Sequence, residues 1–327
     1  MRKEAAVDLA PGHKVGLTLA NPVMPAAGCF GFGKEYDQLV EVESLGAIIV
    51  GPVTAGPRRG AEPPRILPLP HCQGRMGETL PPSQGRAGEV LPTEAGGPGE
   101  EHLPPAPGGL GGVLLHTGLA NPGVAAVVRR YGRAWARSPV PVIVHVAGTS
   151  PNEAASCCWR LASVEAVAGI ELGLPDTAGG STGLAEVFDR VTDVIRAARA
   201  AASQPLIVRL PLVWAAALCG AAVEAGADAL TVAAPPRGTV WHAPSDRFVT
   251  GRLYGPFALP LALHVLRRVA ELVPAPLIGC GGIHSAADGM AFLRAGATAI
   301  QVGGALWHDP TSMARIARGL SSTTRPG

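Results

Sequence analysis

Three shortages mark this sequence: few charged residues, few aromatic residues and no long apolar run. Charged side chains make up 16% of the 327 residues and the formal net charge is +2, so neither a nucleic-acid partner nor an anionic membrane surface is indicated. No apolar run reaches the roughly 18–20 residues that cross a bilayer. Aromatic residues make up only 4%, but the hydrophobic content of 47% is ample for a core. The length suits one large α/β barrel or two modest domains.

Metal-binding cysteine patterns are missing as well. The six cysteines show no Cys-x-x-Cys spacing and most lie in apolar runs, which favours reduced, buried thiols over a disulfide or a metal site. The stretch from Met1 to His13 is polar and charged, so no signal peptide is predicted. We therefore expect a cytoplasmic protein with no metal and no membrane contact.

Two short apolar runs near the C-terminal end each stop at a pair of glycines. They are Ala275 to Ile283 and Ala299 to Leu306, with a predicted helix from Ser285 to Ala295 between them. Buried parallel strands have this apolar character, and the last two strands of a (β/α) barrel are the usual position of a phosphate. Glycine lets backbone N–H groups approach phosphate oxygens, although tight strand–helix turns alone also favour it. The pattern predicts a phosphate-bearing ligand.

The rest of the chain alternates between strand and helix patterns. Eight strands alternating with eight helices predict a (β/α)8 TIM barrel, with residues 1–327 as a single domain. Strands are expected within 21–28, 47–54, 140–146, 168–174, 205–210, 227–234, 275–283 and 299–306. Helices are expected over 35–44, from about 123 to 137, and over 151–163, 184–202, 213–225, 257–272, 285–295 and 310–318. A long loop is expected from strand six through Trp241 and Gly251 to Pro256, and Pro52 is expected at the end of strand two.

Residues 57–112, after the second strand, are crowded with proline and glycine. From Pro68 to Gly112 they almost lack β-branched residues. Such a composition buries too little apolar surface to offset the conformational entropy of the chain. A flexible surface insertion is therefore predicted, with a lid over the barrel mouth as the alternative.

Several motifs together resemble the dihydroorotate dehydrogenase family, most closely the soluble class 1 branch that works with an electron-transfer subunit. The resemblance covers most of the chain outside the insertion. It rests on Leu19-Ala-Asn-Pro-Val-Met-Pro-Ala-Ala-Gly-Cys-Phe-Gly-Phe-Gly33, Pro63-Pro-Arg-Ile66, Gly118-Leu-Ala-Asn-Pro-Gly123, Gly255-Pro256, Gly279-Cys-Gly-Gly-Ile283 and Gln301-Val-Gly-Gly-Ala305.

The resemblance implies FMN as the cofactor. Backbone groups at five glycines would hold the phosphate: Gly255, Gly281, Gly282, Gly303 and Gly304. Ala26, Ala27 and Gly28 would lie against the isoalloxazine ring. Arg209 replaces a family lysine and would remain a cation beside the ring. His145 stands where the family has an asparagine, so it is a candidate flavin contact or a core residue.

The substrate side departs from the family pattern. Asp176 falls at the position of the family's catalytic cysteine, where it is either the base or an exposed loop residue. Gly51 replaces a lysine on strand two. Family asparagines are replaced at Leu115, Gly173, Ala178 and Ala234. Losing several such hydrogen-bonding groups is expected to weaken substrate binding strongly.

The resemblance therefore implies a CH–CH oxidoreductase that uses FMN to convert dihydroorotate to orotate in pyrimidine biosynthesis, with turnover impaired by these losses. The alternative is a non-catalytic flavin-binding or scaffold paralogue that has lost the substrate site. A third hypothesis keeps FMN but uses Arg209, His145 or His116 on another substrate. Expected partners are a small-molecule substrate, an electron-transfer subunit and further copies of the chain.

Overall fold

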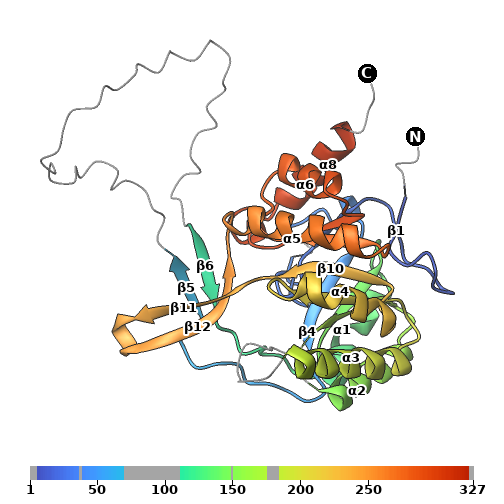
Figure 1. Ribbon diagram of the computed structural model, residues 1–327, viewed down its shortest axis with the longest axis horizontal. Coiled ribbons are helices and arrows are strands. Elements are labelled where there is room, and N and C mark those ends of the chain that lie inside the picture. Colours follow the sequence, from blue (N-terminus) through green and yellow to red (C-terminus); the bar gives the residue numbers. More distant parts are fainter. Residues whose placement is uncertain (1–5, 37–38, 70–110, 149, 175–183, 324–327) are drawn as a thin grey trace, which may run out of the picture.

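The computed structural model describes residues 6–36, 39–69, 111–148, 150–174 and 184–323 (Figure 1). Eight parallel strands form its centre in the order β3-β14-β13-β10-β9-β8-β7-β4, and Gly46 N donates to Val23 O at 2.8 Å between the two end strands. The predicted (β/α)8 barrel is confirmed. Its strands are β3 (Val23–Pro25), β4 (Ile48–Val53), β7 (Val142–Ala147), β8 (Val167–Gly173), β9 (Leu206–Pro211), β10 (Ala229–Ala234), β13 (Leu277–Cys280) and β14 (Ala299–Val302).

The helices surround the barrel and pack on it through one shared apolar core. They are α1 (Val124–Trp135), α2 (Pro151–Ala162), α3 (Leu184–Ala201), α4 (Ala215–Glu224), α5 (Ala258–Leu272), α6 (Ala286–Arg294), α7 (Ala305–His308) and α8 (Ser312–Thr323). Serine caps fix two of the starts: Ser150 accepts from Glu153 N, and Ser285 forms a capping box with Asp288. No described helix is long and apolar enough to cross a membrane.

The interior of the barrel is closed at the amino ends of its strands. A second apolar cluster there joins Ile49, Ile143, Ile207 and Ile278 to residues of the N-terminal segment, such as Leu19. That segment forms the short hairpin of β1 (Val7–Asp8) and β2 (Thr18–Leu19). Because apolar side chains fill this end, a ligand site inside the barrel is expected at the carboxyl ends of the strands.

A four-stranded antiparallel sheet lies to one side of the barrel (Figure 1). It consists of β5 (Ile66–Leu69), β6 (Gly112–Leu115), β11 (Arg237–His242) and β12 (Arg247–Tyr254) in the order β11-β12-β6-β5. One expectation is thereby wrong, because the loop after strand six is a hairpin. Within the predicted insertion, residues 66–69 form a paired strand. Residues 70–110 lie outside the described part of the chain, so the insertion and the single domain stay predictions.

Two smaller expectations also fail. In the described part of 35–44 the only helical turn is the 3-10 turn η1 (Val42–Ser44). Val40 is buried in the core and Tyr36 and Val42 pack against it, so the apolar spacing of this segment reflects burial of irregular chain and not a helix. Pro52 lies inside β4 and not at its end. The ladder between β4 and β7 skips from Val50 to Val53, so the proline sits at an irregularity where no ladder hydrogen bond is required.

Candidate functional site

One cavity opens at the carboxyl ends of the barrel strands. It is bordered by β9, β10, β13 and β14, and by the junction of β12 with α5. The predicted cofactor residues that line it are Ala26, Ala27, Arg209, Gly255, Gly281, Gly282, Gly303 and Gly304. Gly28 and His145 do not line it. The structure therefore brings together residues from distant parts of the chain, although their binding of FMN stays a prediction.

The glycine end of the cavity has the geometry that a phosphate requires. Gly281 and Gly282 have φ values of +135° and +69°, and a Cβ on Gly282 would lie 2.3 Å from Leu259 N in the first turn of α5. Within the described residues, no backbone hydrogen bond outside the strand ladders involves the N–H groups of Gly282, Gly303 and Gly304. Free N–H groups next to a helix N-terminus form an anion site, so the phosphate of FMN fits here.

A buried polar cluster lies beneath the cavity and reaches it through Arg209. Glu171 is fully buried on β8 and accepts from Thr231 Oγ1 and Gln301 Nε2 at 2.7 Å each. It also lies 2.9 Å from His145 Nδ1 and 3.3 Å from Arg209 Nε. An ionised carboxylate can only accept hydrogen bonds, so in the contact between His145 and Glu171 the proton is on His145 Nδ1. Every group in this cluster restrains its neighbours.

Arg209 is bound on three sides. Besides Glu171, its guanidinium donates to Gln301 Oε1 and, at 3.6 Å, to Cys280 Sγ. Burial lowers the pKa of Arg209, but the opposite charge of Glu171 outweighs burial and the pKa is raised. Burial likewise raises the pKa of Glu171, and Arg209 with His145 outweighs it, so that pKa falls well below its usual range. The pair is therefore ionised and places a fixed cation beside the cavity.

The thiols near the cavity are poor nucleophiles. Burial, and next the neighbouring Cys280, raises the pKa of Cys29 to about 12 despite the opposing charge of Arg209. Burial also raises the pKa of Cys280. Because the thiolate is the reactive form, both side chains are inert near neutral pH.

The departures from the family pattern are linked to one another in space. A Cβ on Gly173 would lie 2.8 Å from His145 Cε1 and 2.9 Å from His145 Nε2. A Cβ on Gly51 would lie 2.8 Å from His145 O, and Gly51 has a φ of +112°. The family asparagine and lysine at these two positions would collide with the present backbone and imidazole. The absence of a side chain at Gly51 and Gly173 thus goes together with the position that His145 has in this structure.

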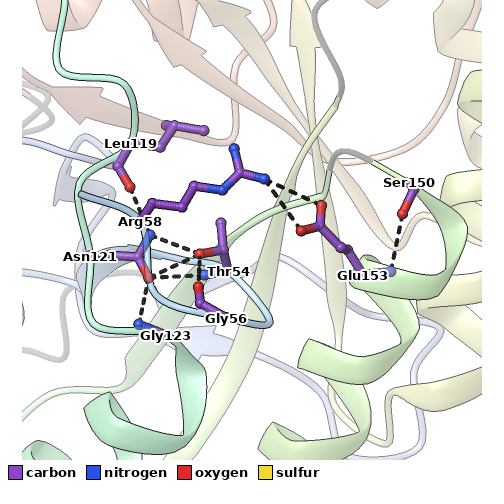
Figure 2. A network of polar contacts seen from close by, with 8 residues as sticks. All are labelled: Thr54, Gly56, Arg58, Leu119, Asn121, Gly123, Ser150 and Glu153. Atoms are coloured by element: carbon purple, nitrogen blue, oxygen red, sulfur yellow. Dashed lines mark hydrogen bonds and ion pairs between the residues drawn. The ribbon is translucent and has the colours of Figure 1, made fainter. Parts of the chain in front are cut away.

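Asn121 organises a second polar network, at the loop before α1 (Figure 2). Its Oδ1 accepts from Gly123 N at 2.8 Å and from Thr54 N at 3.2 Å, and its Nδ2 donates to Leu119 O at 2.7 Å. Figure 2 also shows Arg58 reaching Glu153 at the start of α2, 3.3 Å away. The motif from Gly118 to Gly123 therefore ties the end of β4 to two helices.

Sequence reasoning missed several residues of the site. Glu171, Thr231 and Gln301 had a visible signal, since polar residues inside apolar barrel strands are costly unless they are paired. Tyr254, Leu212 and His284 also line the cavity or its rim, and only the tertiary arrangement brings them there. Asp176 lies outside the described residues, so its role as a base stays a prediction. Within the described ranges, no group of three or more His, Cys, Asp or Glu is placed to hold a metal ion.

A (β/α)8 barrel that is closed at one end, with a cavity lined by glycines and a buried cation at the other, is the class of fold to which the chain belongs. The sequence model of the family described as dihydroorotate dehydrogenase matches residues 12–76 and 104–323. The chain belongs to this family.

Three relatives carry the same name, dihydroorotate dehydrogenase B (NAD(+)), catalytic subunit. The protein from Pelobacter propionicus is 32% identical over 98% of this chain and 93% of its own length. The protein from Desulforudis audaxviator is 33% identical over 98% of this chain and 92% of its own length. The protein from Geobacter sulfurreducens is 32% identical over 92% of this chain and 88% of its own length. The similarity thus extends over nearly the whole chain.

Proposed function

We propose that the chain is a dihydroorotate dehydrogenase-like oxidoreductase that binds FMN and oxidises dihydroorotate to orotate slowly, in pyrimidine biosynthesis. The observation that carries this proposal is the cavity at the carboxyl ends of the strands, which is lined by Gly255, Gly281, Gly282, Gly303 and Gly304 together with Arg209. The full-length similarity to catalytic subunits of that name supports it.

Different residues of the cavity would hold different parts of the cofactor. The N–H groups of Gly281, Gly282, Gly303 and Gly304 would hold the phosphate, with Gly255 packed beside the first turn of α5. Bound FMN would supply the hydride acceptor. Arg209 keeps a positive charge at the cavity floor, which favours negative charge developing on a ligand there. Ala26 and Ala27 leave room beside β3 for a flat group.

The substrate side explains why we propose slow turnover. Asp176, three residues beyond the end of β8, would take the substrate proton in place of the family's cysteine. Its ordinary pKa near 4 makes a carboxylate a weaker base than a thiolate. No amide side chain stands at Gly173 or Ala234, which line or border the mouth, so the polar groups of the substrate lack partners there.

Absorbance spectroscopy tests this function. The purified protein, incubated with FMN and desalted, is expected to retain a flavin band, because the phosphate site is preformed. Addition of dihydroorotate without oxygen is expected to bleach that band slowly. Rapid, stoichiometric bleaching would refute the slow turnover, and a colourless protein that takes up no FMN would refute the cofactor assignment itself.

The relatives are catalytic subunits by name, so we also propose an electron-transfer subunit as the partner of this chain. A cytoplasmic location belongs to the same proposal, because five cysteines of the described residues are free, buried thiols, as a reducing compartment allows. Co-expression of the two subunits followed by size-exclusion chromatography would show a joint peak, whereas separate elution would contradict the partnership.

A further inference from the structure

Tyr254 lines the cavity at the carboxyl ends of the strands. It is the last residue of β12 and is fixed on β6 opposite Val113. Its aromatic ring packs edge-on against Trp307, with centroids 5.0 Å apart and an interplanar angle of 62°. Its Cβ lies 3.7 Å from where a Cβ on Gly304 would be, so the side chain starts beside the phosphate site.

Tyr254 shares this cavity with residues from several elements. Ala26 and Ala27 follow β3, Arg209 is on β9 and Cys280 ends β13. Burial also raises the pKa of Tyr254. Tyr254 and Arg209 thus line one and the same cavity.

The space that remains is small. The cavity measures about 40 Å³ for the centres of water molecules. That is enough for a few waters, whereas pockets that enclose drug-sized ligands measure roughly 300–1,000 Å³. A fused three-ring group is therefore larger than the space that remains while Tyr254 lines this cavity.

We propose that Tyr254 is the residue that sets flavin affinity in this chain, because its phenol ring fills the space that the isoalloxazine ring needs. This inference rests on the proposed function. FMN binds when the phenol swings out of the mouth, and the loss of its burial and of its contact with Trp307 opposes binding. Affinity is thus limited by the volume of this side chain and not by its hydroxyl.

FMN titration of four variants tests this proposal, with binding followed by quenching of flavin fluorescence. Tyr254→Ser removes the ring and is expected to lower the Kd for FMN at least tenfold. Tyr254→Phe keeps the ring and is expected to stay within twofold of the unsubstituted chain. Trp159→Ser, an exposed aromatic on α2, is the matched control and is expected to change nothing. Tyr254→Leu keeps apolar packing against Trp307, and an intermediate gain is expected.

The outcomes separate the proposal from the function on which it rests. FMN binding that is equal in the unsubstituted chain, Tyr254→Ser and Tyr254→Leu overturns the role of Tyr254 and leaves the flavin function standing. A Tyr254→Phe variant that gains affinity like Tyr254→Ser overturns the steric account. If every variant is folded by circular dichroism and none binds FMN, the flavin function fails together with the proposal. Should Tyr254→Ser not fold, Tyr254→Leu carries the comparison.

Discussion

Glu171 shows how one carboxylate organises the floor of the site. It holds Arg209, His145, Thr231 and Gln301 at once, so the positions of four side chains depend on it. A buried charge is tolerated only when it is paired and hydrogen-bonded. Here Glu171 and Arg209 are paired with each other, and neighbouring side chains hydrogen-bond to both. The fixed cation of the cavity is therefore a consequence of Glu171.

Replacing Glu171 by Gln is expected to destabilise the fold by about 3–5 kcal/mol at pH 7, because Arg209 becomes an unpaired buried cation. Urea unfolding measures this loss. The matched control is Glu186→Gln, which removes an exposed ion pair with Arg190 and is expected to cost under about 1 kcal/mol. Equal losses in the two variants would show that the buried pair adds nothing to stability.

The pH dependence of this difference has a defined sign. The pKa of Glu171 is lowered on folding, so its contribution is complete above the unfolded value near 4.3 and is lost as pH falls toward the folded pKa. The stability gap between the unsubstituted chain and Glu171→Gln is thus expected to be constant from pH 8 to about pH 5 and to narrow below about pH 4. A gap that widens in acid would contradict this assignment.

At the scale of elements, the loop before α1 is held by one side chain. Asn121 satisfies the N–H groups of Thr54 and Gly123, and its amide holds Leu119, which has a φ of +58°. A non-glycine residue in this region is strained and persists only when its surroundings hold it. The start of α1 and the end of β4 are therefore fixed together.

Asn121→Ala is expected to cost about 2–4 kcal/mol, since buried N–H groups lose their acceptor and the strained turn loses its restraint. Thermal or urea unfolding measures the change. Glu153→Gln, which weakens only the half-exposed pair with Arg58, is the control and should cost under about 1 kcal/mol. If the Asn121 variant behaves like its control, the loop is held by its backbone contacts with Arg58 instead.

The sequence predicts the barrel elements well and the antiparallel sheet poorly. Barrel strands such as β7 are buried along their whole length, so they appear as apolar runs. β11 alternates exposed and half-buried residues and depends on pairing with β12, so nothing local distinguishes it from a loop. The same reason applies to the site. Glycines whose backbone N–H groups are expected to bind a phosphate can be recognised as sequence motifs. Tyr254, by contrast, reaches the cavity only because β12 pairs with β6.

At the scale of the whole molecule, the two ends of the barrel have different tasks. Apolar side chains close the amino end, while polar and charged side chains form the floor at the carboxyl end. The sheet of β11, β12, β6 and β5 lies outside both, and it exposes aromatic residues. Trp241 is 52% exposed and Phe248 72% exposed, and their rings meet edge to face 5.0 Å apart. Such a pair on a projecting hairpin favours a contact with another polypeptide.

We expect this hairpin to join two copies of the chain, since twofold dimers are the commonest oligomers and the exposed aromatic pair offers an apolar surface for such a contact. Light scattering after size exclusion is expected to give twice the mass of one chain. Trp241→Ser combined with Phe248→Ser is expected to halve that mass, whereas Trp159→Ser, equally exposed on α2, should leave it unchanged. A dimer that survives the double substitution places the interface elsewhere, and a monomeric unsubstituted chain leaves the hairpin free for a different subunit.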